Sequence, residues 1–119
     1  MIKILHEAYN LKSAFFVTTH AYTSTQHLID GHDKHDLLRG RAAAHNIVPT
    51  TSGAAIAVVE SLPELKGKIE GYALRVPVID GSITSIVAKV EKKVSARDVN
   101  AVFKRKAANE YKGIVQYTD

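Results

Sequence analysis

The spacing of apolar residues changes along the first part of the chain, from helical to strand-like. Residues 2–10 carry apolar side chains at helical spacing, and Asn10 is a plausible end for that helix. Aromatic and β-branched residues follow at 14–17 in a run too short for a helix, so residues 13–21 are expected to form a strand. Residues 22–45 show no strong period and are expected to form a long ordered loop.

The middle of the chain predicts a brief strand followed by a helix. Ile47 and Val48 indicate the strand, and Pro49 is expected to end it. Ser52 is a good N-cap residue. The alanine-rich segment after it favours a helix that ends near residue 62.

The last part of the chain predicts two strands, a helix and a final strand. Alternation over residues 70–79 and a mixed apolar pattern over 82–91 indicate the two strands. The Asp-Gly pair at 80–81 is expected to join them as a tight hairpin. A helix with a capping box is expected to begin at Ser95, and a short strand is expected over 113–117.

This order of elements predicts an α+β fold. Strands joined by a hairpin occur among helices, which favours a mixed, largely antiparallel sheet with helices packed on one face. No G-x-G-x-x-G motif is present, so these residues do not encode a dinucleotide-binding fold. With 119 residues, the chain has the length of about one domain.

Composition narrows the classes of function. A hydrophobic content of 45% with 24% charged residues is ordinary for a soluble globular protein, and no apolar run is long enough to span a membrane. The chain has no cysteine, so it holds no disulfide and no thiol nucleophile, and a cytoplasmic location is expected. A net charge of +4 favours anionic partners such as phosphorylated metabolites. The basic residues are scattered, and nucleic-acid binding is not expected.

One histidine is a candidate for catalysis. His20 stands where a buried strand gives way to a loop, so it is held rigidly and can still be reached by a ligand. Imidazole is the side chain best matched to proton transfer near neutral pH. A structural histidine that only forms hydrogen bonds fits the same position, and both interpretations stay open at this point.

Two further features are candidates for anion binding. Ser52 and Gly53 stand at a predicted helix N-terminus, where unpaired N–H groups and the helix dipole attract anions, although simple capping needs only one hydroxyl. Arg75 shares its strand face with only the small Ala73, so its guanidinium can extend across the sheet to a phosphate or carboxylate. The alternative for Arg75 is an exposed residue paired with an acid.

No metal site is expected. The run His32-Asp33-Lys34-His35 contains possible ligands. Its spacing matches no recognised ligand set, and a lysine lies between them.

Several motifs, taken in order, resemble those of the glyceraldehyde-3-phosphate dehydrogenase family. They are Thr18-Thr19-His20-Ala21-Tyr22-Thr23, Arg39-Gly40-Arg41-Ala42-Ala43-Ala44, Pro49-Thr50-Thr51-Ser52-Gly53-Ala54-Ala55, Leu62-Pro63-Glu64-Leu65-Lys66-Gly67-Lys68, Arg75-Val76-Pro77-Val78, and Lys112-Gly113-Ile114 through Tyr117-Thr118. The resemblance covers essentially all 119 residues. It places the chain in the central part of the family's catalytic domain.

The resemblance implies part of an NAD-dependent enzyme of glycolysis. Such an enzyme oxidises glyceraldehyde 3-phosphate and transfers the acyl group to inorganic phosphate, giving 1,3-bisphosphoglycerate. A cysteine is the nucleophile. His20 is similar to the histidine that activates this thiol and acts as a base during hydride transfer.

The resemblance also implies two phosphate sites. Thr23 and Arg75 are similar to the residues that hold the phosphate of the substrate. Arg39, Ser52 and Gly53 are similar to those that hold the attacking phosphate. Serine keeps the hydroxyl that many members supply with threonine, so anion binding is expected to survive.

Partners and missing parts follow from the same resemblance. The loop over residues 22–44 is similar to a segment that packs between subunits of a homotetramer. The NAD-binding domain, the catalytic cysteine and the C-terminal end of the family are expected to lie outside residues 1–119, so the isolated chain is expected to be inactive. Two alternatives stay open, namely a segment of erythrose-4-phosphate dehydrogenase and a non-catalytic binding or oligomerisation module.

Overall fold

The computed structural model describes residues 1–118, which fall into two compact units. One unit combines residues 1–13 with the segment from residue 88 onward, and the other comprises residues 14–87. The helices and strands, in chain order, are α1 (Ile2–Tyr9), β1 (Leu11–Ala21), the short 3₁₀ helix η1 (Leu37–Gly40), β2 (Val48–Thr51), α2 (Ala54–Ser61), the 3₁₀ helix η2 (Pro63–Leu65), β3 (Ile69–Val76), β4 (Ser82–Val90) and α3 (Ala96–Ala108). Within residues 1–118, none of the helices has the length and apolar character needed to cross a membrane.

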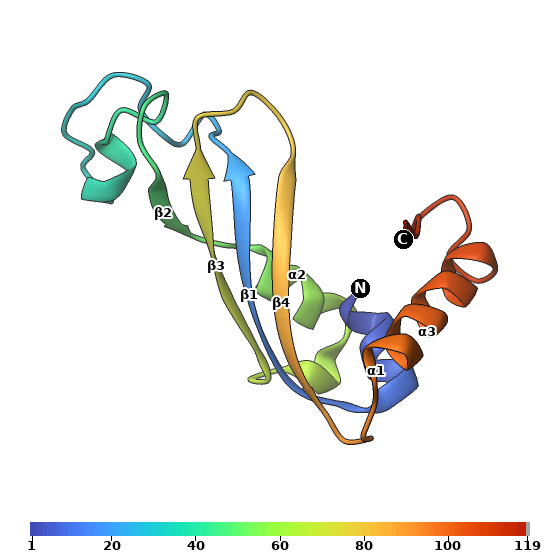
Figure 1. Cartoon of the computed structure of the whole chain (residues 1–119). Helices are drawn as coiled ribbons and strands as arrows, with labels where there is room; N and C mark the ends of the chain where they lie inside the picture. The colour runs from blue at the N-terminus through green and yellow to red at the C-terminus, as the bar shows by residue number, and fades with distance from the viewer. Residues whose placement is uncertain (119) are drawn as a thin grey trace. The chain divides into compact units, whose positions relative to one another are not determined.

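The four strands form one mixed sheet in the order β2-β3-β1-β4 (Figure 1). Strand β1 runs parallel to β3, and β2 runs antiparallel to β3. The register places His20 beside Arg75 and Thr18 beside Ala73, so each pair shares a face of the sheet. A mixed sheet accompanied by helices confirms the α+β prediction.

The predicted hairpin between the third and fourth strands is wrong. Strand β1 lies between β3 and β4, so the two strands joined by residues 77–81 are not neighbours in the sheet. The chain does bend at this point, and Gly81 has a φ of 86°. The carbonyl oxygen of Gly81 accepts a 3.0 Å hydrogen bond from the Ala21 N–H at the end of β1. An Asp-Gly pair therefore signals a reversal of the chain, whereas the choice of strand partner is made by distant residues.

Two local predictions in the middle of the chain shift by one or more residues. Pro49 lies inside β2 and does not end it, because β2 is an edge strand where a missing N–H is tolerated. Gly53, and not Ser52, is the N-cap of α2. The hydroxyl of Ser52 instead accepts a hydrogen bond of 3.2 Å from the Ala54 N–H.

The strand predicted over residues 113–117 is also wrong. The segment begins with a turn in which the N–H groups of Ile114 and Val115 both donate to the carbonyl oxygen of Tyr111, at 2.9 Å. Gly113 adopts a φ of 82°. An apolar run becomes a strand only when a neighbouring strand supplies hydrogen bonds, and local turn bonds satisfy the backbone here.

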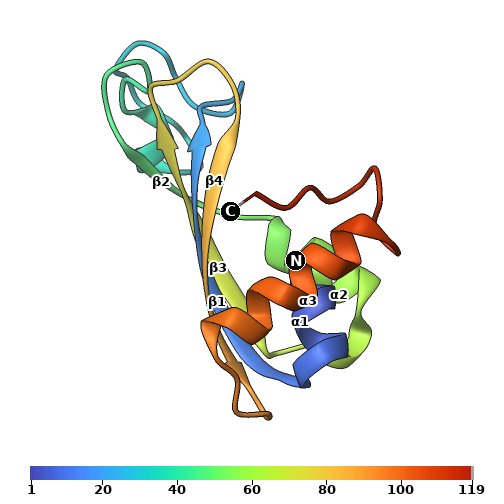
Figure 2. The same ribbon diagram turned by 45° about the vertical axis from the view of Figure 1, so that its right-hand side comes forward.

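The unit that holds both chain ends is built around a pair of helices. Helices α1 and α3 pack against each other (Figures 1 and 2). Its buried apolar residues are Ile2, Ile4, Tyr9, Leu11, Phe103 and Ala107. The predicted capping box of α3 is confirmed, with Ser95 and Asp98 bonding reciprocally. Lys106 lies 2.7 Å from a carboxylate oxygen of Glu7 and 2.5 Å from one of Glu110, and these bonds raise the pKa of Lys106.

The larger unit has its core on one face of the sheet. Its buried apolar residues are Ala14, Phe16, Ala21, Ala43, Val48, Leu65, Ile69 and Ala73. Helix α2 contacts β3. On the opposite face, the Phe15 and Tyr72 rings meet edge to face, with centroids 6.0 Å apart, and both remain partly exposed. Gly71 lies opposite Phe16 and leaves room for its ring.

Adding a methyl group at Gly71 tests this packing. A Cβ there would lie 2.5 Å from the Phe16 carbonyl oxygen and 2.7 Å from its ring atoms, so Phe16 would have to shift. We expect Gly71→Ala, in the full-length protein in which this chain naturally occurs, to cost about 1–3 kcal/mol and lower the urea midpoint. Gly31→Ala is the control, because its nearest neighbouring atom would be 3.9 Å away. Equal midpoints for the two variants would contradict the packing described.

Candidate functional site

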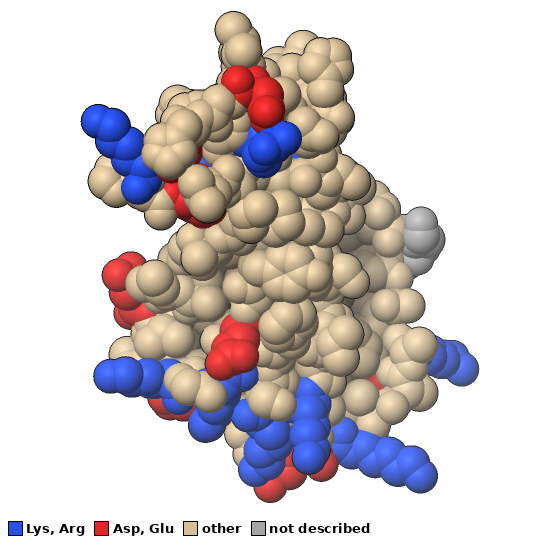
Figure 3. All heavy atoms as spheres, turned by 90° about the vertical axis from the view of Figure 1, so that its left-hand side faces the viewer, with Lys and Arg blue, Asp and Glu red and all other residues tan. Residues whose placement is uncertain are grey.

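The candidate site forms where β1 and β3 end together. Because the two strands are parallel and in register, their carboxyl ends bring His20 and Arg75 to the same edge and the same face of the sheet. The loop over residues 22–45 begins immediately afterwards. Its ion pairs include Arg41 with Asp30 at 2.9 Å, and Figure 3 shows side chains of both signs gathered at this upper end of the molecule.

The imidazole of His20 has two competing neighbours at Nδ1. The carbonyl oxygen of Ala21 lies 2.6 Å from Nδ1, and Nη1 of Arg75 lies 2.8 Å away. A guanidinium only donates, so Nδ1 either donates to Ala21 or accepts from Arg75. Donation to Ala21 leaves the lone pair on Nε2, and this is the tautomer that a base acting through Nε2 requires.

Arg75 carries a positive charge that no carboxylate balances among the described residues. Its Nε donates to the Thr50 hydroxyl at 3.3 Å, and its Nη1 donates to the Ala21 carbonyl oxygen at 3.2 Å. Burial, and then the positive charge of Arg39, lower the pKa of the Arg75 guanidinium. An acidic partner would raise that pKa, so the alternative of an acid-paired strand arginine does not fit. Two arginines close enough to repel each other favour an anion between them.

Arg39 lies in η1 and contacts three different residues of the site. Its Nε is 3.1 Å from Oδ2 of Asp36. Its Nη1 donates to the Thr25 hydroxyl at 2.9 Å, and its Nη2 donates to the Thr51 hydroxyl at 3.4 Å. The guanidinium is therefore only partly neutralised and is surrounded by hydroxyl groups.

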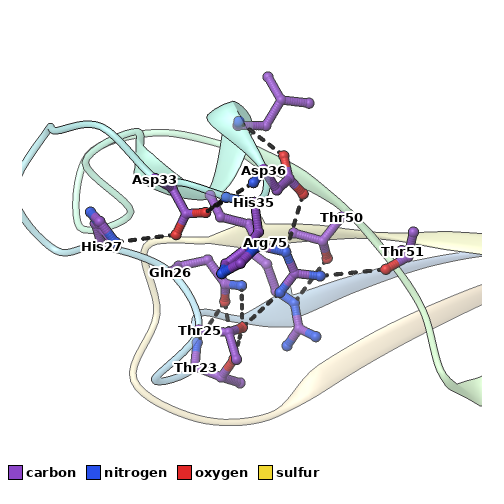
Figure 4. Close-up of polar contacts among 12 residues, drawn as sticks. Thr23, Thr25, Gln26, His27, Asp33, His35, Asp36, Thr50, Thr51 and Arg75 are labelled. Atoms are coloured by element: carbon purple, nitrogen blue, oxygen red, sulfur yellow. Dashed lines mark hydrogen bonds and ion pairs between the residues drawn. The ribbon is translucent and has the colours of Figure 1, made fainter.

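Thr23 is held by a residue that the sequence did not single out. The amide oxygen of Gln26 accepts from the Thr23 N–H at 2.9 Å and from the Thr23 hydroxyl at 3.1 Å (Figure 4). The amide nitrogen of Gln26 donates to the Thr25 hydroxyl at 2.7 Å. The sequence shows only a polar run here, and its partners become visible once the loop is folded.

Ser52 and Gly53 lie beside this cluster without a hydrogen bond to it among those seen in the described residues. Ser52 lines a hollow of about 500 Å³ together with Thr50 and Thr51, the two hydroxyl residues that contact Arg75 and Arg39. A Cβ at Gly53 would meet nothing within 4 Å, so space stands open at the N-terminus of α2. The structure thus brings His20 and Arg75 into contact and links Thr23 to Arg39 through Thr25.

The histidine-rich part of the loop is engaged in loop contacts. Oδ1 of Asp33 accepts from the N–H groups of His35 and Asp36 at 2.8 and 2.9 Å, and Oδ2 is 3.3 Å from Nε2 of His27 (Figure 4). These contacts lower the pKa of Asp33. Over residues 1–118, no group of three or more His, Cys, Asp or Glu side chains is placed to hold a metal ion.

An anion should stabilise this site measurably. We expect sulfate or phosphate to raise the Tm of the full-length protein by a few degrees, because an anion that binds only the folded state stabilises it. Arg75→Gln should remove most of that rise. Arg41→Gln is the matched control, since Arg41 pairs with Asp30 and has 62% of its side chain exposed. The same rise in Arg75→Gln as in the unmodified protein would exclude Arg75 as an anion ligand.

Comparison with known proteins identifies the family. Residues 1–119 match the family model for the C-terminal domain of glyceraldehyde 3-phosphate dehydrogenase. The whole chain is 48% identical to glyceraldehyde-3-phosphate dehydrogenase of Mycobacterium leprae and 49% identical to that of Mycolicibacterium smegmatis, and it covers 35% of each. Over 117 residues, or 98% of the chain, it is 47% identical to the Geobacillus stearothermophilus enzyme, again covering 35% of it.

The chain therefore spans about a third of the length of these relatives. The match is to the C-terminal domain of the family, which corrects the expectation of a central part of the catalytic domain. The family model, the relatives and the α+β fold all indicate the same family. The chain belongs to the glyceraldehyde-3-phosphate dehydrogenase family and is part of its C-terminal domain.

Proposed function

We propose that the full-length protein is a phosphorylating glyceraldehyde-3-phosphate dehydrogenase to which this chain supplies a base and two anion sites. The observation that carries the proposal is the contact between His20 and Arg75, 2.8 Å apart at the ends of paired parallel strands. A proton acceptor and an unbalanced cation on one face suit a substrate that carries both a reacting group and a phosphate.

His20 acts as the base in this proposal. With Nδ1 donating to the Ala21 carbonyl oxygen, the Nε2 lone pair takes the proton of a cysteine thiol supplied by the remainder of the protein. The resulting thiolate adds to the aldehyde carbon, and the protonated imidazole gives its proton to the new alkoxide, which becomes a hydroxyl and leaves His20 neutral. When the hydride leaves, neutral His20 takes the hydroxyl proton, so the charges balance at each step.

The two arginines hold two different phosphates. Arg75 and the Thr23 hydroxyl bind the phosphate of the aldehyde substrate, on the side of His20. Arg39 binds the attacking inorganic phosphate, together with Ser52 and Gly53 at the open N-terminus of α2. The Thr50 hydroxyl accepts from Arg75, and the Thr51 hydroxyl accepts from Arg39.

NAD would accept the hydride in this reaction. Residues 1–118 offer no glycine-rich strand-to-helix loop for a dinucleotide. The cofactor is expected to bind mainly to another domain of the full-length protein. The full-length protein is expected to be cytoplasmic.

The loop over residues 22–44 is proposed to pack against a neighbouring subunit of a homotetramer. Its apolar side chains support this, because Leu28, Ile29, Leu37 and Leu38 are between 51% and 85% exposed in the single chain. Several exposed apolar side chains in one loop favour association with another protein surface, because association removes them from water.

Replacing the proposed base tests the function. We expect His20→Asn in the full-length protein to lower kcat by about 10²–10⁴-fold, the range for a general base. The readout is NADH formation from glyceraldehyde 3-phosphate and phosphate. His45→Asn is the control, because His45 is an exposed residue of the same unit. A loss of kcat below tenfold would reject the role of His20. A higher kcat/KM with erythrose 4-phosphate than with glyceraldehyde 3-phosphate would identify the protein's substrate as the four-carbon aldehyde.

A further inference from the structure

Gln26 differs from its neighbours in being almost completely buried. It is 4% exposed, while Ser24, Thr25 and His27 around it are exposed. Burying an uncharged amide costs free energy unless its oxygen and its nitrogen both find partners. An amide retained in this position therefore points to bonds that the fold or the site requires.

The oxygen end of Gln26 controls Thr23. Oε1 accepts from both the N–H and the hydroxyl of Thr23, while the Gln26 N–H donates back to the Thr23 carbonyl oxygen at 3.0 Å. These three bonds close the turn and fix the direction of the threonine side chain. An arriving phosphate competes for the hydroxyl only, because the backbone bond to Gln26 remains in place.

The nitrogen end of Gln26 is connected to Arg39 through the Thr25 hydroxyl. Nε2 donates to the Thr25 hydroxyl, whose oxygen also accepts from Nη1 of Arg39. The Thr25 hydroxyl proton then points toward the Thr23 hydroxyl oxygen, 3.2 Å away. The arrangement needs one side chain that accepts at one end and donates at the other (Figure 4).

The backbone brings the same partners together independently. The His27 N–H donates to the carbonyl oxygen of Arg39 at 2.9 Å, and the Ala43 N–H donates to the carbonyl oxygen of His27 at 2.9 Å. The loop can therefore hold Arg39 near residue 26 without the Gln26 side chain. What the amide adds is the orientation of the hydroxyl groups and of the guanidinium.

We propose that Gln26 is a positioning residue that couples the two phosphate sites, by orienting Thr23 at one end of its amide and Arg39, through Thr25, at the other. This proposal rests on the proposed function, which assigns Thr23 to the substrate's phosphate and Arg39 to inorganic phosphate. Gln26 itself touches neither phosphate.

Two substitutions separate the two ends of the amide in the full-length protein. Gln26→Met keeps the size but removes all three side-chain hydrogen bonds, so the KM for glyceraldehyde 3-phosphate and the KM for inorganic phosphate should each rise by about 3- to 10-fold. Gln26→Glu keeps the acceptor for Thr23, loses the donor to Thr25 and places a carboxylate near Arg39. It should raise mainly the KM for inorganic phosphate.

A substrate without a phosphate provides the readout that a structural role would not move. With unphosphorylated glyceraldehyde, the aldehyde KM of Gln26→Met should equal that of the unmodified protein, because no phosphate contacts Thr23. Gln116→Met is the control for replacing a glutamine, since Gln116 is exposed and lies in the other unit. It should leave all the constants unchanged.

The outcomes distinguish this inference from the proposed function. The coupling would be overturned if both KM values of Gln26→Met were unchanged or if only one of them rose. It would also be overturned if the KM for unphosphorylated glyceraldehyde rose as much as the KM for glyceraldehyde 3-phosphate. The proposed function would still stand if the unmodified protein is active and His20→Asn is not. If Gln26→Met fails to fold, Gln26→Glu provides the test. The inference would be overturned if the KM of Gln26→Glu for glyceraldehyde 3-phosphate rose as much as its KM for inorganic phosphate.

Discussion

The site depends on the parallel pairing of β1 with β3. This register sets His20 beside Arg75 and Thr18 beside Ala73, so all four side chains lie on one face. A shift of one residue would turn the imidazole and the guanidinium to opposite faces of the sheet. Gly71 makes the pairing possible by leaving space for the Phe16 ring. The histidine and the arginine are therefore positioned by the sheet, and not by a flexible loop.

Charge and hydroxyl groups then complete the arrangement. Arg75 loses part of its hydration and lies near a second arginine, and both effects lower its pKa. The loop adds Thr25, and β2 adds Thr50 and Thr51, so hydroxyl acceptors and not carboxylates contact most of the two guanidinium groups. Cations that are surrounded by hydroxyls keep their affinity for a phosphate, which a neighbouring carboxylate would compete away. Asp36 is the exception, and it pairs with the outer arginine, Arg39.

Local signals in the sequence predicted local structure well. The helix that ends at Asn10 and the capping box at Ser95 both follow from neighbouring residues, and both are confirmed. Strand partners depend on distant residues, which is why the hairpin prediction missed that β1 lies between β3 and β4. The same limit applies to the site. His20 and Arg75 were recognisable by residue type, whereas Gln26 gains its meaning only when Thr23, Thr25 and Arg39 surround it.

The proposed function depends above all on Arg75 holding the substrate's phosphate beside His20. A crystal structure of the full-length protein with glyceraldehyde 3-phosphate bound tests this most directly. We expect phosphate oxygens about 2.7–3.2 Å from the Arg75 guanidinium and the Thr23 hydroxyl, with His20 Nδ1 still donating to the Ala21 carbonyl oxygen. A substrate phosphate bound away from Arg75, or a His20 imidazole turned away from the aldehyde carbon, would contradict it.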